Sequence, residues 1–253
     1  MRRDNRGDNV PTRDAGETGF AAANGSGLSF GIEVEGLTKR VHGTEVLRDV
    51  TLSVPAGTTV GLSGPNGSGK TMLMRAVLGL IRPTEGFVAI DGKRLWRDIS
   101  FPPSAGLLLE GPAFLSSRSG VDNLELLASI RGVVGRDACE RAMAGVGLDP
   151  ADKRPFRKYS LGMKQRLGIA GAVLEVPDLL VLDEPTNALD SSGVEMLKGI
   201  VRREQKRGAT ILLACHDADI LRELSDEICY LAEGHVDGHE TLGGKRGGAC
   251  HAA

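Results

Sequence analysis

Short runs of apolar residues alternate with amphipathic stretches between residues 58 and 216. The runs TTVGLSG, LLVLDEP and TILLACH each end where polar residues begin, which is typical of parallel strands buried on both faces. The stretches KTMLMRAVLGL and SGVEMLKGIVRREQKRG have the apolar spacing of helices, and Gly208 ends the second one. This alternation predicts an α/β fold with a mostly parallel sheet and helices on both faces.

Two other stretches also predict regular structure. FVAIDGKRL, at residues 87–95, contains the pair Asp91 and Gly92, which is typical of a hairpin turn between strands. Residues 121–148 have helical periodicity, and Asp122 or Asp137 is a suitable N-cap.

Both ends of the chain are poor in branched apolar residues. We therefore predict a disordered segment at residues 1–30 and a flexible tail at residues 243–253, because little apolar surface is there to offset the entropy of ordering. Four potential metal ligands lie near the tail, and for these a frayed tail is favoured over a metal cluster: His235, His239, Cys250 and His251.

Charge and composition restrict the partners. The formal net charge is -2, with 31 basic and 33 acidic residues, and 4% of the residues are aromatic. Nucleic-acid-binding domains concentrate positive charge and often stack bases on aromatic rings, so we expect no nucleic-acid partner. The longest uncharged stretch, residues 50–69, holds two prolines and cannot span a membrane. If the protein acts at a membrane, another chain must supply the spans.

The cysteines indicate a reducing compartment. No two of the four lie at C-x-x-C spacing, and no apolar run follows the N-terminal arginine pair as an export signal requires. Cys215 precedes His216, which leaves a nucleophile–base pair as one alternative. Neighbouring residues on a strand face opposite sides, so a core cysteine is favoured.

A glycine-rich loop lies between the first of these strands and the following helix. GPNGSGKT fits the pattern G-x-x-x-x-G-K-[ST] and comprises Gly64, Pro65, Asn66, Gly67, Ser68, Gly69, Lys70 and Thr71. In such a loop the backbone N–H groups and the helix N-terminus face phosphates. Lys70 adds a charge at the β- and γ-phosphates, and the Thr71 hydroxyl ligates Mg²⁺.

Two acidic residues end the strand LLVLD. Asp183 is placed to hold Mg²⁺, and Glu184 is placed to polarise an attacking water as a general base. Adjacent acids after a strand are often only solvated, so this assignment depends on the phosphate loop lying beside them.

Together with YSLGMKQR, at residues 159–166, these motifs resemble those of the nucleotide-binding subunits of ABC transporters. The resemblance covers residues 32–242 approximately. GPNGSGKT resembles the Walker A loop and LLVLDE resembles Walker B, while NALD resembles the D-loop and places Asp190 at the site. His216 resembles the switch histidine, which contacts the γ-phosphate. The resemblance implies hydrolysis of Mg²⁺-bound ATP by in-line attack of water.

The same resemblance implies a fold. It is that of a P-loop NTPase, with a RecA-like core, a mostly parallel sheet, a small antiparallel β lobe and a helical signature lobe. The lobes are expected at about residues 32–60 and 86–97, and at about residues 112–160, within an ATPase domain that spans residues 31–242.

YSLGMKQR takes the place of the signature motif, with Leu161 where glycine is commoner. In this family the motif completes the ATP site of the opposite subunit in a head-to-tail dimer. The resemblance thus implies that Ser160 and the backbone of Gly162 bind the γ-phosphate held by a second copy. The residues alone also predict a helix capped by Ser160, and the two interpretations are compatible.

Two positions depart from the family pattern. Val41 stands where an aromatic residue usually stacks on adenine, with His42 beside it, so we expect looser base discrimination and tolerance of GTP. Glu110 stands where glutamine usually senses Mg²⁺, and a carboxylate can ligate the metal directly. An acid here together with SLGMKQR resembles the branch of bacitracin- and lantibiotic-resistance exporters.

The resemblance implies a second partner, an integral-membrane permease that meets the chain near residues 110–120 and the helical lobe. The protein would then lie on the cytoplasmic face of the cell membrane. Three alternatives are less favoured. A non-transport ATPase of the superfamily would need inserted coiled coils, zinc cysteines or a second cassette. A degenerate regulatory subunit is opposed by intact Lys70, Asp183, Glu184 and His216, and a small-molecule kinase would lack the signature run.

Overall fold

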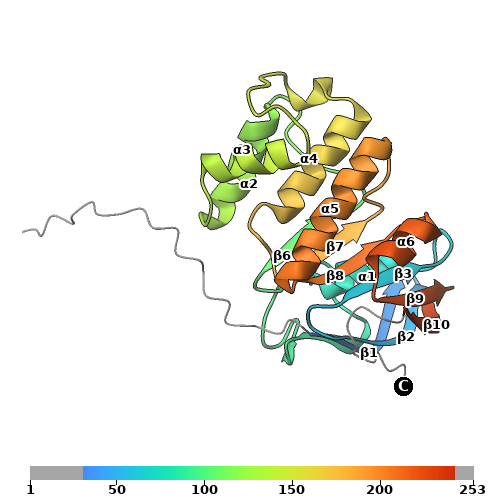
Figure 1. Ribbon diagram of the computed structural model, residues 1–253. Coiled ribbons are helices and arrows are strands. Elements are labelled where there is room, and N and C mark those ends of the chain that lie inside the picture. The colour runs from blue at the N-terminus through green and yellow to red at the C-terminus, as the bar shows by residue number, and fades with distance from the viewer. Residues whose placement is uncertain (1–30, 243–253) are drawn as a thin grey trace, which may run out of the picture.

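The structure, a computed structural model, describes residues 31–242. The segment predicted to be disordered, residues 1–30, and the predicted flexible tail, residues 243–253, lie outside the described residues. The described chain forms a six-stranded sheet, a four-stranded sheet and helices packed around them (Figure 1).

The six-stranded sheet forms the centre of the molecule, in the order β10-β9-β3-β8-β7-β6. Its neighbours pair in parallel except β9 and β10, which form an antiparallel hairpin at one edge. The predicted α/β fold with a mostly parallel sheet is therefore confirmed. The strands are β3 (Thr59–Ser63), β6 (Ala105–Leu108), β7 (Leu179–Asp183), β8 (Thr210–Ala214), β9 (Glu227–Ala232) and β10 (His235–Thr241).

The four-stranded sheet is antiparallel, in the order β2-β1-β4-β5. The predicted turn between β4 and β5 is present, with positive φ at Asp91 and Gly92. The predicted β lobe extended to Val60, but Thr59 and Val60 belong to β3 in the central sheet. The four strands are β1 (Ile32–Val41), β2 (Thr44–Val54), β4 (Glu85–Ile90) and β5 (Lys93–Arg94).

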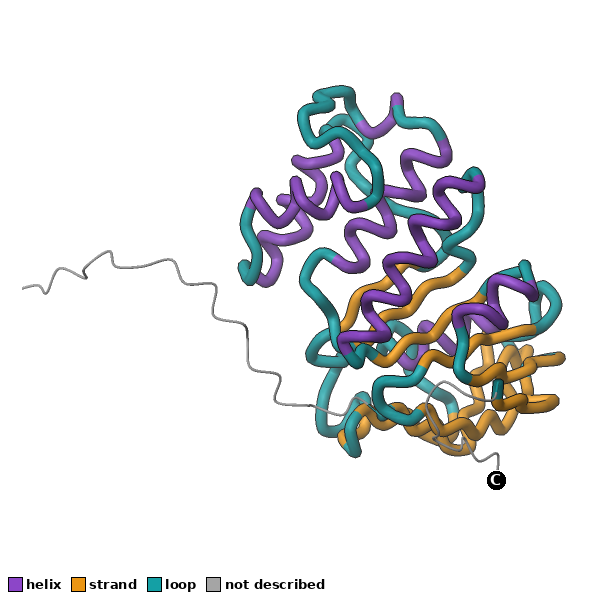
Figure 2. Tube along the Cα trace, in the orientation of Figure 1, coloured by secondary structure: helices purple, strands orange, loops and turns teal. Residues whose placement is uncertain are grey.

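Helices cover both faces of the central sheet. One face packs against α4, α5 and α6 in a core that also holds α2 and α3, and the other packs against α1 and the antiparallel sheet (Figure 2). The helices are α1 (Lys70–Val77), α2 (Gly120–Arg131), α3 (Arg136–Gly145), the short η1 (Phe156–Lys158), α4 (Leu161–Val173), α5 (Ser191–Arg207) and α6 (Ala218–Leu224). None of the helices within residues 31–242 has the length and apolar character to cross a membrane.

The N-caps predicted for residues 121–148 are wrong. The cap of α2 is Ser119, whose Oγ accepts a hydrogen bond from the backbone N–H of Asp122, and the cap of α3 is Gly135. Asp122 and Asp137 lie in the first turns instead, where a negative charge interacts favourably with the helix dipole. Gly208 ends α5 in a left-handed conformation, as predicted.

The frayed tail predicted for the histidines near the C-terminus is wrong for two of them. His235 and His239 lie in β10, and His239 Nε2 is 3.1 Å from Oε2 of the buried Glu227 on β9. Within residues 31–242 no group of three or more His, Cys, Asp and Glu side chains is placed to hold a metal ion. Cys250 and His251 lie outside the described residues.

Candidate nucleotide-binding site

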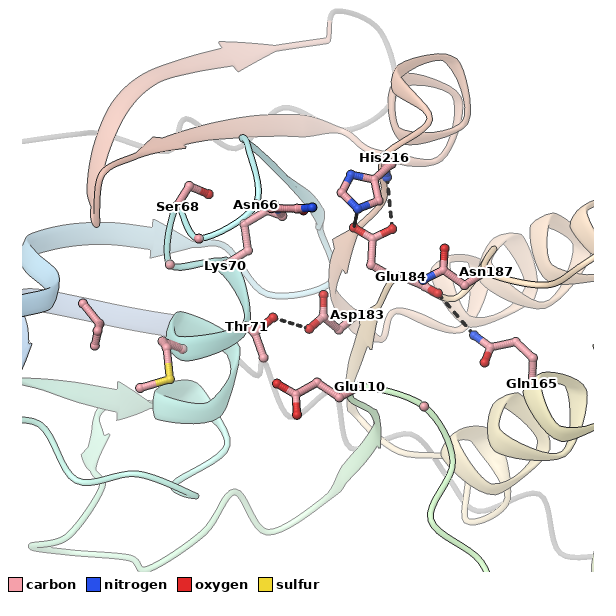
Figure 3. A pocket seen from close by; sticks show the side chains of 15 residues that line it. Asn66, Ser68, Lys70, Thr71, Glu110, Gln165, Asp183, Glu184, Asn187 and His216 are labelled. Carbon is pink, nitrogen blue, oxygen red and sulfur yellow. Dashed lines mark hydrogen bonds and ion pairs between the residues drawn. The ribbon is translucent and has the colours of Figure 1, made fainter. Parts of the chain in front are cut away.

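A pocket of about 530 Å³ opens where the parallel strands of the central sheet end. Four strands send chain into it from their carboxyl ends, which is where open α/β sheets bind ligands. The phosphate loop follows β3, Glu110 follows β6, Asp183 and Glu184 stand at the end of β7, and His216 follows β8 (Figure 3). The lining residues are Val46, Asn66, Gly67, Ser68, Gly69, Lys70, Thr71, Met72, Glu110, Gly111, Gln165, Asp183, Glu184, Asn187 and His216.

The loop GPNGSGKT encloses its own lysine. Lys70 Nζ donates hydrogen bonds to the carbonyl oxygens of Gly64, at 2.7 Å, and of Pro65, at 3.2 Å. Gly64 has a φ of 150°, and a Cβ there would lie 2.1 Å from the carbonyl oxygen of Leu231, so only glycine fits. The cap position of α1 is Gly69, and no side chain caps this helix. Its first N–H groups are therefore available to an anion.

Ser68 supports the same conclusion. Its Oγ is buried and has no hydrogen-bond partner, although buried hydroxyls are normally paired. A ligand with acceptor oxygens in the loop would fit this arrangement of a free hydroxyl, backbone N–H groups and an ammonium group.

Thr71 and Asp183 form a pair of oxygen ligands. Thr71 Oγ1 donates a 2.6 Å hydrogen bond to Asp183 Oδ2, which joins the start of α1 to the end of β7. Hydroxyl and carboxylate oxygens suit a hard cation such as Mg²⁺, which is usually held by one or two protein groups, substrate phosphates and water. The donor set thus fits Mg²⁺ bound together with a nucleotide.

Glu184 and His216 face each other across the pocket. His216 Nε2 lies 3.3 Å from Glu184 Oε1, and the backbone N–H of His216 donates to Glu184 Oε2 at 3.2 Å. The glutamate is mostly buried and the imidazole is half exposed. Glu184 has a φ of 50°, so it leaves the line of β7 and turns its carboxylate into the pocket. The structure thus brings together the predicted base and the predicted switch histidine.

Glu110 also lies on left-handed backbone, with a φ of 49°, two residues beyond the end of β6. Its Oε2 accepts a 2.6 Å hydrogen bond from Nη2 of Arg75 on α1, an ion pair that the sequence did not suggest. Glu110 therefore lines the pocket, as expected, but its carboxylate already has a cationic partner.

Ser160, Gly162 and Asp190 do not line this pocket. Ser160 caps α4, because its Oγ accepts a 3.2 Å hydrogen bond from the N–H of Met163, as the capped-helix interpretation predicted. Asp190 caps α5 through the N–H of Gly193, at 2.8 Å. This backbone hydrogen bond is the main reason that the pKa of Asp190 is lowered. Ser160 is therefore exposed at the N-terminus of α4 and lies outside the lining of the pocket that holds Lys70 of the same chain.

The apolar side of the pocket differs from the expectation. Val41, at the end of β1, is absent from the lining, whereas Val46 on β2 and Met72 on α1 are present. Neither residue was predicted from the sequence, where the only signal was their place near the phosphate loop.

Two polar lining residues were also missed as site residues. Gln165 donates to the carbonyl oxygens of Glu184, at 3.2 Å, and of Pro185, at 3.1 Å. Asn187 lies three residues after Glu184. Both lie within motifs that the sequence had marked, SLGMKQR and NALD, and that was the available signal.

The nucleophile alternative for Cys215 is not supported. The side chain is buried, burial raises the pKa of its thiol, and its Sγ lies 3.2 Å from Thr186 Oγ1. His216 points into the pocket instead. The core cysteine is therefore the correct interpretation.

The fold and the site define a P-loop nucleoside triphosphatase. The phosphate loop follows a strand and opens a helix, and an acidic strand end lies beside it. Residues 47–187 match the family described as ABC transporter. The chain belongs to this family, as an ATP-binding subunit that contains an ABC ATPase domain.

The relatives agree with this assignment. The chain is 43% identical over 211 residues to the "Uncharacterized ABC transporter ATP-binding protein YybJ" of Bacillus subtilis, a match that covers 83% of this chain and 97% of the relative. It is 38% identical to the "Bacitracin transport ATP-binding protein BcrA" of Enterococcus faecalis, a match that covers 83% of this chain and 68% of that relative. It is 34% identical to the "Lantibiotic transport ATP-binding protein SrtF" of Streptococcus pyogenes, a match that covers 83% of this chain and 93% of that relative.

Solved structures show the same architecture. A dimeric ATP-binding cassette in a post-hydrolysis state, bound to ADP and Pi, superposes with a TM-score of 0.75 at 25% identity. The match covers 85% of this chain and all of that one.

Proposed function

We propose that two copies of this chain form a head-to-tail dimer that hydrolyses Mg²⁺-bound ATP and drives a separate membrane permease, as an exporter of antimicrobial peptides. The position of Ser160 and Gly162 carries the proposal, because neither residue lines the pocket of its own chain. A γ-phosphate bound at Lys70 would then meet Ser160 and Gly162 of a second copy. The dimeric cassette among the similar structures supports this arrangement.

The pocket residues divide the chemistry of hydrolysis. Lys70 and the N–H groups of the phosphate loop hold the β- and γ-phosphates, and Thr71 and Asp183 would hold Mg²⁺. When bound, the ion neutralises charge that develops on the phosphates. Glu184 accepts the proton of the attacking water. His216 holds Glu184 in place and itself contacts the γ-phosphate. Positioning and electrostatics supply most of the rate.

An apolar groove is the surface that we assign to the permease. It has a volume of about 390 Å³ and is lined by β6 with the chain that follows it, by the C-terminal end of α2 and by the C-terminal half of α4. Leu107, Leu127 and Ile130 line it and are exposed, with Ile130 77% exposed. Exposed apolar surface of this kind is typical of a contact with another protein. Docking there would place the chain at the cytoplasmic face of the membrane.

The names of two relatives support antimicrobial peptides as the cargo. They are described as a bacitracin and a lantibiotic transport ATP-binding protein, and both are at least 34% identical to this chain. We therefore assign the chain to peptide-antibiotic export and retain tolerance of GTP as part of the proposal, because no aromatic residue lines the described pocket.

Phosphate release by the full chain tests the enzymatic part of the proposal. Glu184→Gln should lower the steady-state rate at least about a hundredfold, as expected for loss of a general base, while ATP binding persists. The same variant should accumulate as a dimer with ATP, measured by light scattering. Glu195→Gln, on the exposed side of α5, is the matched control and should behave as the wild type. A wild type that binds ATP without releasing phosphate would favour the regulatory alternative instead.

A further inference from the structure

Arg75 is a cation at the edge of the pocket that none of the motifs includes. It lies on α1, and its Nη2 bonds Oε2 of Glu110 at 2.6 Å. The arginine side chain is 34% exposed and that of the glutamate is 60% exposed, so the pair is accessible to water. Such a pair is weak enough for a bound ligand to rearrange.

One face of α1 contacts both acidic strand ends. Thr71 and Arg75 are four residues apart on the helix, so their side chains lie one turn above each other. Thr71 bonds Asp183 at the end of β7, and Arg75 bonds Glu110 beyond the end of the neighbouring strand β6. The ion pair and the proposed metal ligands Thr71 and Asp183 are therefore held by the same helix, and Figure 3 shows Glu110 beside those ligands.

The pocket lining carries more negative than positive side chains, and the ion pair of Arg75 and Glu110 changes that balance. Three carboxylates line it, those of Glu110, Asp183 and Glu184, and Lys70 is the only lysine or arginine among the described lining residues. An unpaired Glu110 would repel the phosphates of a metal-free nucleotide and would attract a divalent cation. Arg75 cancels that charge without occupying the pocket itself.

We propose that Arg75 is a positioning residue, which neutralises Glu110 and thereby sets how strongly nucleotide binding depends on Mg²⁺. The inference rests on the proposed Mg²⁺ site at Thr71 and Asp183. An acid at position 110 is then compatible with a polyphosphate ligand because its partner on α1 offsets its charge. Without Arg75, metal-free nucleotide binds more weakly and added Mg²⁺ strengthens binding more.

Calorimetric titration with a non-hydrolysable ATP analogue tests this inference on the full chain. The measured quantity is the Kd in EDTA divided by the Kd in excess Mg²⁺, at a protein concentration where light scattering shows a monomer. Arg75→Gln should raise this ratio about 1.4- to 5-fold, the range for a partly exposed charge pair. Glu110→Gln should lower it by a similar factor, and the double variant should return close to the wild type.

Two further variants separate charge from folding. Arg75→Lys keeps the charge and should stay near the wild-type ratio. Arg97→Gln removes an arginine that is 72% exposed and does not line the pocket, so it controls for net charge. If Arg75→Gln does not fold, Glu110→Gln must lower the ratio and Arg75→Lys must preserve it.

The possible results have distinct meanings. The inference is overturned if Arg75→Gln matches Arg97→Gln, or if the double variant keeps the raised ratio of Arg75→Gln and does not return close to the wild type. A wild-type ratio of one would overturn the Mg²⁺ assignment itself. If the wild type responds to Mg²⁺ and only the Arg75 variants fail to shift the ratio, the proposed function stands and this inference falls.

Discussion

Replacing Ser160 separates two roles that one hydroxyl has in the proposed dimer. In the structure its Oγ accepts a hydrogen bond from the N–H of Met163 and caps α4. A hydroxyl that accepts one hydrogen bond can still donate its proton, so it can cap the helix and bind a phosphate oxygen together. Alanine removes both interactions, whereas aspartate preserves the cap and places a negative charge at the phosphate.

The two variants should rank differently in thermal stability and in ATP-dependent dimerisation. Loss of the cap costs about 1 kcal/mol, which lowers Tm by roughly 2–4 °C in a domain of this size. Aspartate caps as well as serine, so Ser160→Asp should keep the wild-type Tm or exceed it. A hydrogen bond to a charged group is worth about 1.5–3 kcal/mol, and the proposed dimer has two equivalent sites, so Ser160→Ala should weaken ATP-dependent dimerisation roughly 150-fold or more. Ser160→Asp should weaken it further by repulsion.

The assay compares thermal unfolding with ATP-dependent dimerisation, in a Glu184→Gln background that prevents turnover. Ser119→Ala is the matched control, because Ser119 caps α2 in the same way and should lower Tm without affecting the dimer. All variants should still bind ATP through Lys70. The reasoning fails if Ser160→Asp dimerises as well as the wild type, or if dimerisation simply follows Tm through the series.

Two further predictions concern stability. Gly106→Ala would place a Cβ 1.8 Å from the carbonyl oxygen of Ala172 and should lower the free energy of unfolding by about 3 kcal/mol or more. Gly199→Ala, on the open side of α5, should raise it by about 0.5–1 kcal/mol. Denaturant titration measures both changes, and equal effects of the two variants would contradict the contact. The lowered pKa of Asp190, caused first by the N–H of Gly193, means that its contribution is complete above the ordinary aspartate pKa and is lost as pH falls. Asp190→Asn keeps the cap, so its Tm should fall less steeply than that of the wild type below about pH 4, and parallel curves would refute the linkage.

The central strands and the phosphate loop were predictable because local pattern decides them. Strands such as β7 are buried on both faces, so every residue is apolar until the acidic end. The hairpin at Asp91 and the end of α5 at Gly208 were predictable for the same reason, because both need left-handed backbone.

Features decided by neighbours were not predictable. Ser119 and Asp122 are both good caps, and the choice between them depends on where the chain enters α2. β10 is a polar edge strand, with His239 against a buried glutamate, so it has no apolar pattern. The pair of Arg75 and Glu110 joins residues 35 positions apart and exists only once the chain that follows β6 lies beside α1.

The close contact of α4 with β6 lies near the C-terminal end of the helix, so a rotation about that contact would displace the N-terminal end most. Its C-terminal half rests on β6 so closely that Gly106 has no room for a methyl group, and the same strand leads to the loop that carries Glu110. The 13 residues of α4 span about 20 Å, with Ser160 at the opposite end. A tilt of about 10° around that contact would move Ser160 by roughly 3 Å, the length of one hydrogen bond. In the proposed dimer, a shift of this size beside one nucleotide would be large enough to make or break the contact of Ser160 with the other.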